Sequence, residues 1–139
     1  MVELITGNNG KGKTKVLLDK VNTAIKEANG SIVYLDKNTK HMYDLNNKIR
    51  LIDVSAYPIS NCDEFVGFIC GIISQDHDLE AVYLDGFLNI AKLEDQDITA
   101  TLKKLDEIGK KFGIKLIFSI SMDKDSIPAE YQDAVSVSL

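Results

Sequence analysis

The sequence predicts an α/β domain, a three-layer sandwich built on a mainly parallel sheet of five or six strands. Short apolar segments alternate along the chain with longer segments of helical periodicity, which is typical of a parallel sheet covered on both faces. A glycine-rich loop stands between the first apolar segment and the first helical one. With 139 residues, 45% of them hydrophobic, the chain suits a single domain spanning 1–139.

Apolar runs bounded by turn residues predict the strands, and apolar residues at three-to-four spacing predict the helices. The predicted strands are Val2–Thr6, Ser31–Asp36, Ile49–Ser55, Ala81–Asp85, Ile114–Ser121 and, at an edge of the sheet, Ala134–Leu139. The predicted helices are Lys13–Ala28, Asp63–Ser74 and Asp95–Phe112, with a short turn near His41–Leu45 and a short helix bearing Pro128.

Some residues receive a more specific structural expectation. We expect Asn29-Gly30 to end the first helix as a left-handed cap. Gly67 and Gly71 are expected to let the second helix lie close on the sheet, with Cys70 in the core. The buried stripe of the third helix is predicted to be Ile98, Leu102, Leu105, Ile108 and Phe112.

Bulk properties disfavour several classes of protein. The net charge of −5 and the pI near 5.0 disfavour a nucleic-acid partner, because such binders are usually basic. The longest apolar run, FVGFICGII, is too short for a membrane span, and no N-terminal signal is visible. Cys62 and Cys70 form no zinc pattern, so we expect reduced thiols and a cytoplasmic protein.

The segment GNNGKGKT matches the phosphate-loop pattern G-x-x-x-x-G-K-[ST], or Walker A, and lies between a predicted strand and a predicted helix. Its glycines allow backbone angles that direct successive N–H groups at a phosphate. We expect Lys13 to reach the β- and γ-phosphates and Thr14 to place its hydroxyl on Mg²⁺. The predicted nucleotide-binding residues are Gly7, Asn8, Asn9, Gly10, Lys11, Gly12, Lys13 and Thr14.

Polar residues follow several predicted strands at the ends where a doubly wound sheet binds ligands. Asp85 ends an apolar strand and is expected to hold Mg²⁺ together with Thr14. Asp36 and Asp53 end neighbouring strands and are weaker candidates for a catalytic carboxylate, between which the sequence does not choose. Ser119 and Ser121 also belong to this polar rim, whereas His41 and His77 are expected at the surface.

Through Gly7–Thr14 and Ala81–Asp85, the chain resembles the P-loop NTPase superfamily. It also looks like small bacterial ATP-binding proteins of similar length, some of which carry a twitching-motility label. The segment TGNNGKGKT is similar to the TGNGKGKT loop of cob(I)alamin adenosyltransferases, with one more residue between the first glycine and GKT. These resemblances imply ATP and Mg²⁺ as ligands and, for the last family, adenosyl transfer to a corrinoid.

Motifs that the sequence lacks exclude some classes of nucleotide-binding protein. Neither D-x-x-G nor N-K-x-D follows the loop as a GTPase would require, so ATP is favoured. Gly86, not glutamate, follows Asp85, so no water-orienting carboxylate is evident there. The only arginine, Arg50, begins a predicted strand and is expected at the edge opposite the phosphates, which disfavours an arginine finger in cis.

Three function classes remain open, and whether the chain is an enzyme is not decided. The favoured class is an ATP-binding protein that is a slow ATPase or a nucleotide-dependent switch acting on a protein partner. A phosphoryl or adenosyl transferase would be favoured by a second pocket lined by 36–48. A subunit of a homo-oligomeric motor would be favoured by a lysine or Arg50 reaching the site from a neighbouring chain.

Overall fold

The computed structural model describes all residues, 1–139, and contains one six-stranded sheet in which every adjacent pair is parallel. The strand order is β3-β2-β4-β5-β1-β6. The strands are β1 (Val2–Thr6), β2 (Ser31–Asp36), β3 (Arg50–Asp53), β4 (Leu79–Leu84), β5 (Lys115–Ile120) and β6 (Val135–Ser138). This confirms the predicted parallel sheet and places the last strand at an edge, beside β1.

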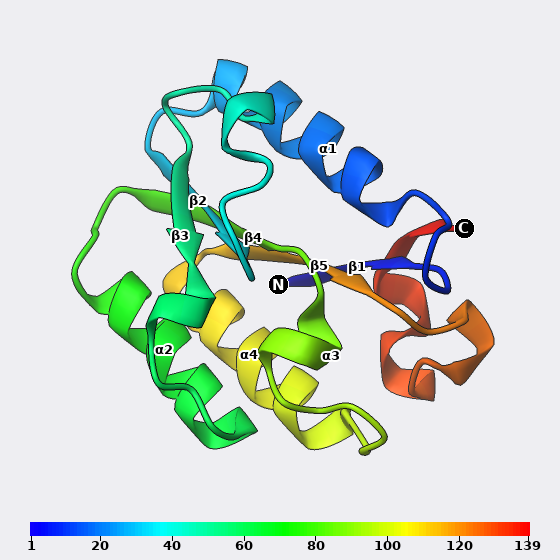
Figure 1. The fold of residues 1–139 in the computed structure, drawn as a ribbon. Helices are drawn as coiled ribbons and strands as arrows, with labels where there is room; N and C mark the ends of the chain where they lie inside the picture. The colour runs from blue at the N-terminus through cyan, green and yellow to red at the C-terminus, as the bar shows by residue number, and fades with distance from the viewer.

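Helices cover both faces of the sheet, so the molecule is the three-layer sandwich that the sequence predicts. Figure 1 shows α1 on one face and α2, α3 and α4 on the other. The α-helices are α1 (Lys13–Glu27), α2 (Cys62–Ser74), α3 (Phe87–Ile90) and α4 (Thr99–Phe112). The 3-10 helices are η1 (Met42–Asp44), η2 (Val54–Ala56), η3 (Lys124–Ser126) and η4 (Ala129–Ala134). None of the helices has both the length and the apolar character needed to cross a membrane.

The alternation of side chains along the strands divides the core into two clusters. On β2, Ile32 and Tyr34 face the smaller cluster under α1, whereas Val33 and Leu35 face the larger cluster under the other helices. In the larger cluster, the rings of Phe87 and Phe118 stack with centroids 4.8 Å apart. Because the central strands are buried on both faces, their sequence is continuously apolar rather than alternating.

The third predicted helix begins later than expected, and a short helix before it was not anticipated. Asp95 has a positive φ of 59°, which is incompatible with a helix. The Asp97 carboxylate accepts hydrogen bonds from both the backbone N–H and the hydroxyl of Thr99, the first residue of α4. Phe112, predicted to be buried, is 55% exposed, so the buried stripe of α4 ends before its last residue.

The expectations for α2 and for its cysteine are also wrong. Gly67, Cys70 and Gly71 are all exposed, and the helix turns larger side chains toward the core instead. The buried residues of α2 are Phe65, Ile69, Ile72 and Ile73. These residues, and not the glycines, define the inward face of α2, because burying a large apolar side chain removes more apolar surface from water than burying a glycine.

Gly30 has another role than the expected left-handed cap, because its φ is not positive. A Cβ atom at Gly30 would lie 1.9 Å from the carbonyl oxygen of Asp78, so only glycine permits this close contact of backbones. The third strand is likewise shorter than predicted. Asp53 accepts a hydrogen bond from the N–H of Ser55 and caps η2, which ends the strand at Asp53.

The hydroxyl of Tyr34 is buried without a hydrogen-bond partner, although its ring is fully packed. An unpaired buried donor costs stability, so Tyr34→Phe is expected to raise the free energy of unfolding by about 1 kcal/mol. Denaturant unfolding measures this difference. Tyr83→Phe is the matched control, because Tyr83 packs in the same cluster and its hydroxyl is not buried without a hydrogen-bond partner. A loss of stability in Tyr34→Phe would contradict the prediction.

Candidate functional site

The loop between β1 and α1 has the backbone of an anion-binding turn. Gly10 and Gly12 have φ values of 83° and 93°, which side chains other than glycine adopt only with strain. Gly12 is also the N-cap of α1, and the first turn of that helix holds no acidic residue. The first-turn N–H groups have no acceptor within the helix, and the positive end of its dipole lies there. The loop is therefore suited to a phosphate.

Two hydrogen bonds hold the loop against segments that follow β5. Asn8 Nδ2 donates to Asp123 Oδ1 at 3.0 Å, and the Ser121 hydroxyl donates to Asn9 Oδ1 at 2.8 Å. Both asparagines, predicted as nucleotide-binding residues, therefore also hold the loop in place through their side chains. Lys11, in contrast, is exposed, and its side chain makes no hydrogen bond or ion pair.

Lys13 is folded back over the loop. The residue is 9% exposed, and its ammonium donates to the carbonyl oxygen of Asn8 at 3.2 Å. Burial lowers the pKa of Lys13, while the negative charge of Asp85 opposes this shift. A partly desolvated ammonium beside a phosphate loop attracts an anion strongly, because less water is present to screen the two charges from each other.

A short hydrogen-bond chain connects α1, β5 and the end of β4. Thr14 Oγ1 donates to Asp85 Oδ2 at 2.8 Å, and Ser119 Oγ donates to Asp85 Oδ1 at 2.7 Å. Ser119 Oγ in turn accepts the N–H of Gly86 at 2.8 Å. The sequence grouped Ser119 with a polar rim but gave it no partner, since the partnership depends on the neighbouring positions of β4 and β5.

The Thr14–Asp85 pair fits Mg²⁺, which prefers hard oxygen ligands and usually takes one or two of them from the protein. No group of three or more His, Cys, Asp or Glu side chains in the molecule is arranged to hold a metal by itself. The donor set therefore suits an ion that is shared with phosphate oxygens and water, not a dedicated protein cage.

Asp36 lies at the same edge, at the end of β2, and is only 3% exposed. Its Oδ1 accepts the N–H of Lys37 at 2.7 Å, whereas its buried Oδ2 has no hydrogen-bond partner. Burial raises the pKa of Asp36, and the nearby charge of Asp85 raises it further; the Lys37 N–H and the positive charges of His41 and Lys37 oppose the rise. An orphan carboxylate oxygen in a polar site is suited to a ligand or a reacting water.

The structure separates the two candidate carboxylates that the sequence could not rank. Asp53 pairs with Asp36 in the β2–β3 register, but its side chain is occupied by Ser55 and does not line the cavity of the site. Its expected access to the site is not seen, because β3 is the edge strand and lies one strand further from the loop.

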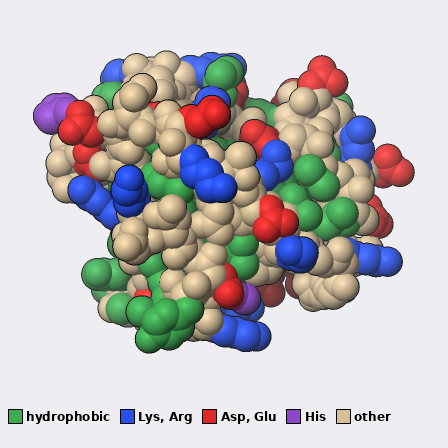
Figure 2. Space-filling model, turned by 90° about the horizontal axis from the view of Figure 1, so that it is seen from above, with side chains coloured by type: hydrophobic (Ala, Val, Ile, Leu, Met, Phe, Trp, Pro, Cys, Tyr) green, Lys and Arg blue, Asp and Glu red, His purple; other side chains and the backbone are tan.

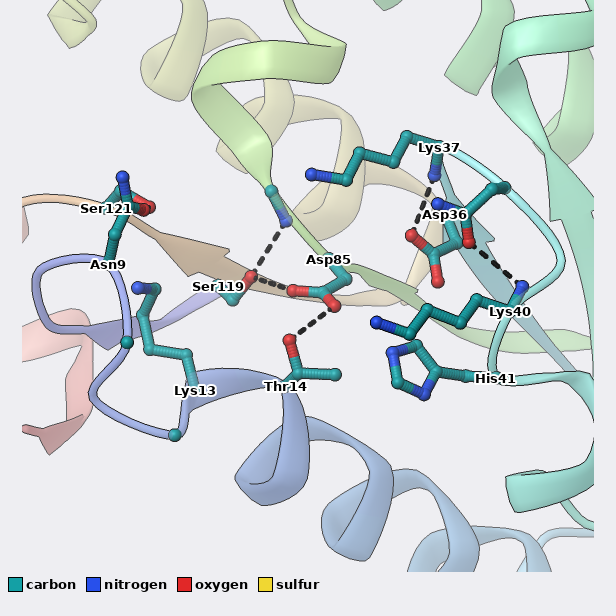
Figure 3. Close-up of a pocket in the computed structure, with 14 residues that line it drawn as sticks. Asn9, Lys13, Thr14, Asp36, Lys37, Lys40, His41, Asp85, Ser119 and Ser121 are labelled. Carbon is teal, nitrogen blue, oxygen red and sulfur yellow. Dashed lines mark hydrogen bonds between the residues drawn. The ribbon is translucent and has the colours of Figure 1, made fainter.

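The functional groups line one cavity of about 340 Å³ at the carboxyl edge of the sheet (Figure 3). None of the lining residues is hydrophobic. They are Asn9, Gly10, Gly12, Lys13, Thr14, Asp36, Lys37, Asn38, Lys40, His41, Asp85, Gly86, Ser119 and Ser121. Gly7, Asn8 and Lys11 of the predicted set are not among them. His41, expected at the surface, is half-buried and pairs with Asp44 at 3.0 Å, while His77 is exposed as predicted.

Comparison with known proteins was made for sequence and for fold. No protein-family model and no curated protein sequence matches the chain. Among solved structures, the fold is similar to that of a KaiC-like protein from the hyperthermophilic archaeon Pyrococcus horikoshii, with a TM-score of 0.60 and 19% sequence identity. The match covers 85% of this chain and 61% of that structure. The fold is of the P-loop NTPase type. At this level of identity the likeness shows the fold alone.

The buried carboxyl group of Asp36 is expected to make the free energy of unfolding depend on pH. Because its pKa is raised above the ordinary value of 3.8, the folded state binds more protons than the unfolded state, and stability falls as the pH rises. Asp36→Asn is expected to be more stable than wild type at about pH 8, since the amide oxygen still accepts the Lys37 N–H without a buried charge.

The gain should shrink on acidification and vanish below pH 3.8, where the carboxyl is neutral in both states. Urea unfolding of both proteins across the pH range measures it. A gain that grows as the pH falls would contradict the assigned cause. Asp53→Asn is the matched control, because this carboxylate is only half-buried and already accepts hydrogen bonds from Ser55.

Proposed function

We propose that the chain binds Mg–ATP at the loop Gly7–Thr14 and is a slow ATPase or a nucleotide-dependent switch. The observation that carries this proposal is the Thr14–Asp85 hydrogen bond, made directly beside a loop shaped for phosphate. Lys13 binds the β- and γ-phosphates, and Thr14 and Asp85 serve the metal. When bound, Mg²⁺ neutralises part of the phosphate charge. A KaiC-like fold is compatible with this function.

In hydrolysis, Asp36 is the proposed base. A water molecule beside its unpartnered Oδ2 attacks the γ-phosphorus, and a new phosphorus–oxygen bond forms. The bond between that phosphorus and the β–γ bridging oxygen breaks, and its electron pair stays on ADP. The water proton passes to Asp36 and then to solvent. A raised pKa makes this carboxylate a stronger base than an ordinary aspartate.

The second candidate is transfer of a phosphoryl or adenosyl group to a small molecule. It is supported by the extension of the cavity from the phosphate loop as far as Lys37, Asn38, Lys40 and His41. This segment gives the cavity a polar compartment next to Asp36, where an acceptor hydroxyl or phosphate would replace the attacking water. The extension belongs to the same cavity as the loop and is not a separate pocket.

A motor subunit completed by a neighbouring chain has less support. Arg50 lies at the amino end of β3 and pairs with Asp76 at 3.3 Å, at the edge of the sheet opposite the cavity. The same side chain on a neighbour would have to leave this pair to reach a phosphate.

Calorimetric titration tests nucleotide binding first. The wild type is expected to bind ATP in a Mg²⁺-dependent manner, and Lys13→Ala to lose about 100-fold in affinity, because it removes a charge-assisted contact to phosphate. Lys15→Ala is the matched control, since this lysine is exposed on the same helix and pairs with Asp19. If the wild type does not bind ATP, or if Lys13→Ala binds as the wild type does, the proposal is wrong.

Turnover tests the role of Asp36. Asp36→Asn is expected to lower kcat for ATP hydrolysis by about 100-fold, the lower range for loss of a general base, with Mg–ATP affinity changed less than about threefold. Asp53→Asn should hydrolyse ATP at the wild-type rate, because Asp53 lies outside the cavity. Phosphate release under saturating ATP measures kcat, and unchanged turnover in Asp36→Asn would remove this residue from the mechanism.

A further inference from the structure

Two lysines line the cavity on the side away from the phosphate loop. Figure 3 shows Lys13 at one end of the cavity, Thr14 and Asp85 in the middle, and Lys37, Lys40 and His41 at the other end. We call residues 37–41, which leave β2 at its carboxyl end, the basic strap. Neither Lys37 nor Lys40 forms an ion pair, although five of the chain's other lysines or arginines do.

The segment that follows the strap is anchored on α1. Asn22 of α1 donates through Nδ2 to the carbonyl oxygen of Asp44 at 2.8 Å and accepts the N–H of Asn46 through Oδ1 at 2.8 Å. Asn38 Oδ1 accepts the N–H of Lys40 at 2.9 Å, which makes a tight turn inside the strap. The strap is therefore followed by a segment anchored on α1, and none of these hydrogen bonds occupies the ammonium group of Lys37 or Lys40.

The carboxylates of the cavity do not neutralise these lysines by contact. Both oxygens of Asp85 accept hydroxyl groups, from Thr14 and Ser119. Asp36 accepts only the backbone N–H of Lys37. The two strap ammonium groups are therefore available to an anion, in a cavity whose wall contains no hydrophobic residue. Such a wall suits phosphate groups and not a nucleobase.

We propose that Lys37 and Lys40 bind the terminal phosphate of the nucleoside triphosphate from the side opposite Lys13, and so supply from the same chain the cation that an arginine finger supplies elsewhere. This inference rests on the proposed nucleotide-binding function. The loop and the α1 N-terminus hold the inner phosphates, and the Thr14–Asp85 pair lies between them and the strap. A phosphate beyond that pair lies beside Asp36 and the strap lysines.

This placement gives the lysines two effects. They favour the triphosphate over the diphosphate, because only the triphosphate carries a group that reaches them. They also stabilise the negative charge on the equatorial oxygens of the γ-phosphoryl group as its bond to the bridging oxygen breaks. The site is then complete within one chain, and turnover per chain does not depend on protein concentration.

Nucleotide discrimination tests the proposal independently of activity. The double variant Lys37→Ala/Lys40→Ala is titrated calorimetrically, in Mg²⁺, with a non-hydrolysable ATP analogue and with ADP. We expect affinity for the analogue to fall about 10- to 100-fold and affinity for ADP to change less than about threefold. Lys48→Ala is the matched control, because this exposed lysine lies between the strap and β3, outside the cavity. Lys37→Arg/Lys40→Arg should largely restore discrimination.

Each result is decisive. An equal loss for both nucleotides would overturn the proposal, because the lysines would then contribute only general positive charge. Unchanged binding of both would also overturn it, because the lysines would then contact neither nucleotide. These failures leave wild-type binding and its dependence on Lys13 intact. If the wild type binds neither nucleotide, the proposed function fails and this inference fails with it. Thermal unfolding of each variant checks that the fold is retained.

Discussion

The parallel arrangement of β1, β5, β4 and β2 is the constraint on which the site depends. Because neighbouring parallel strands end at the same edge, four segments distant in sequence deliver polar groups to one cavity. β5 lies between β1 and β4, and its Ser119 donates a hydrogen bond to Asp85. The carboxylate is held from both sides, by a hydroxyl of α1 and by one of β5. Its position is thus set by three elements of the core, not by a flexible loop.

The same edge holds groups that are unfavourable for folding alone. Lys13 and Asp36 are both largely buried, and burial shifts the pKa of each toward its neutral form. Neither is compensated by an ion pair. A structure that only had to be stable would replace them with apolar side chains of similar size. Their cost is explained if a ligand of complementary charge binds there, since binding then supplies the missing partners.

The parts of the site that are contiguous in sequence could be predicted, and those that depend on strand order could not. Consecutive residues alone were enough to recognise the phosphate loop Gly7–Thr14 and the apolar strand followed by Asp85. Choosing Asp36 over Asp53 required knowing that β3 is at the edge and that Ser55 occupies Asp53. The four residues of α3 are too few to show a helical period. The segment after the strap is anchored by Asn22, which lies on a different element, so no local sequence pattern predicts its position.

The composition of the cavity wall bears on which reaction the site performs. Transfer to an acceptor other than water requires that water be excluded from the γ-phosphoryl group, which apolar lids or closing loops achieve in many transferases. Here every lining residue is polar or glycine, so the wall itself does nothing to keep water out. For the proposed Mg–ATP site, such a wall favours hydrolysis over transfer. A transferase would need its acceptor, or a segment that closes over the strap, to displace the water beside Asp36. Water exclusion is therefore the property that separates the two proposed reactions, because both use the same phosphate loop and the same Asp36.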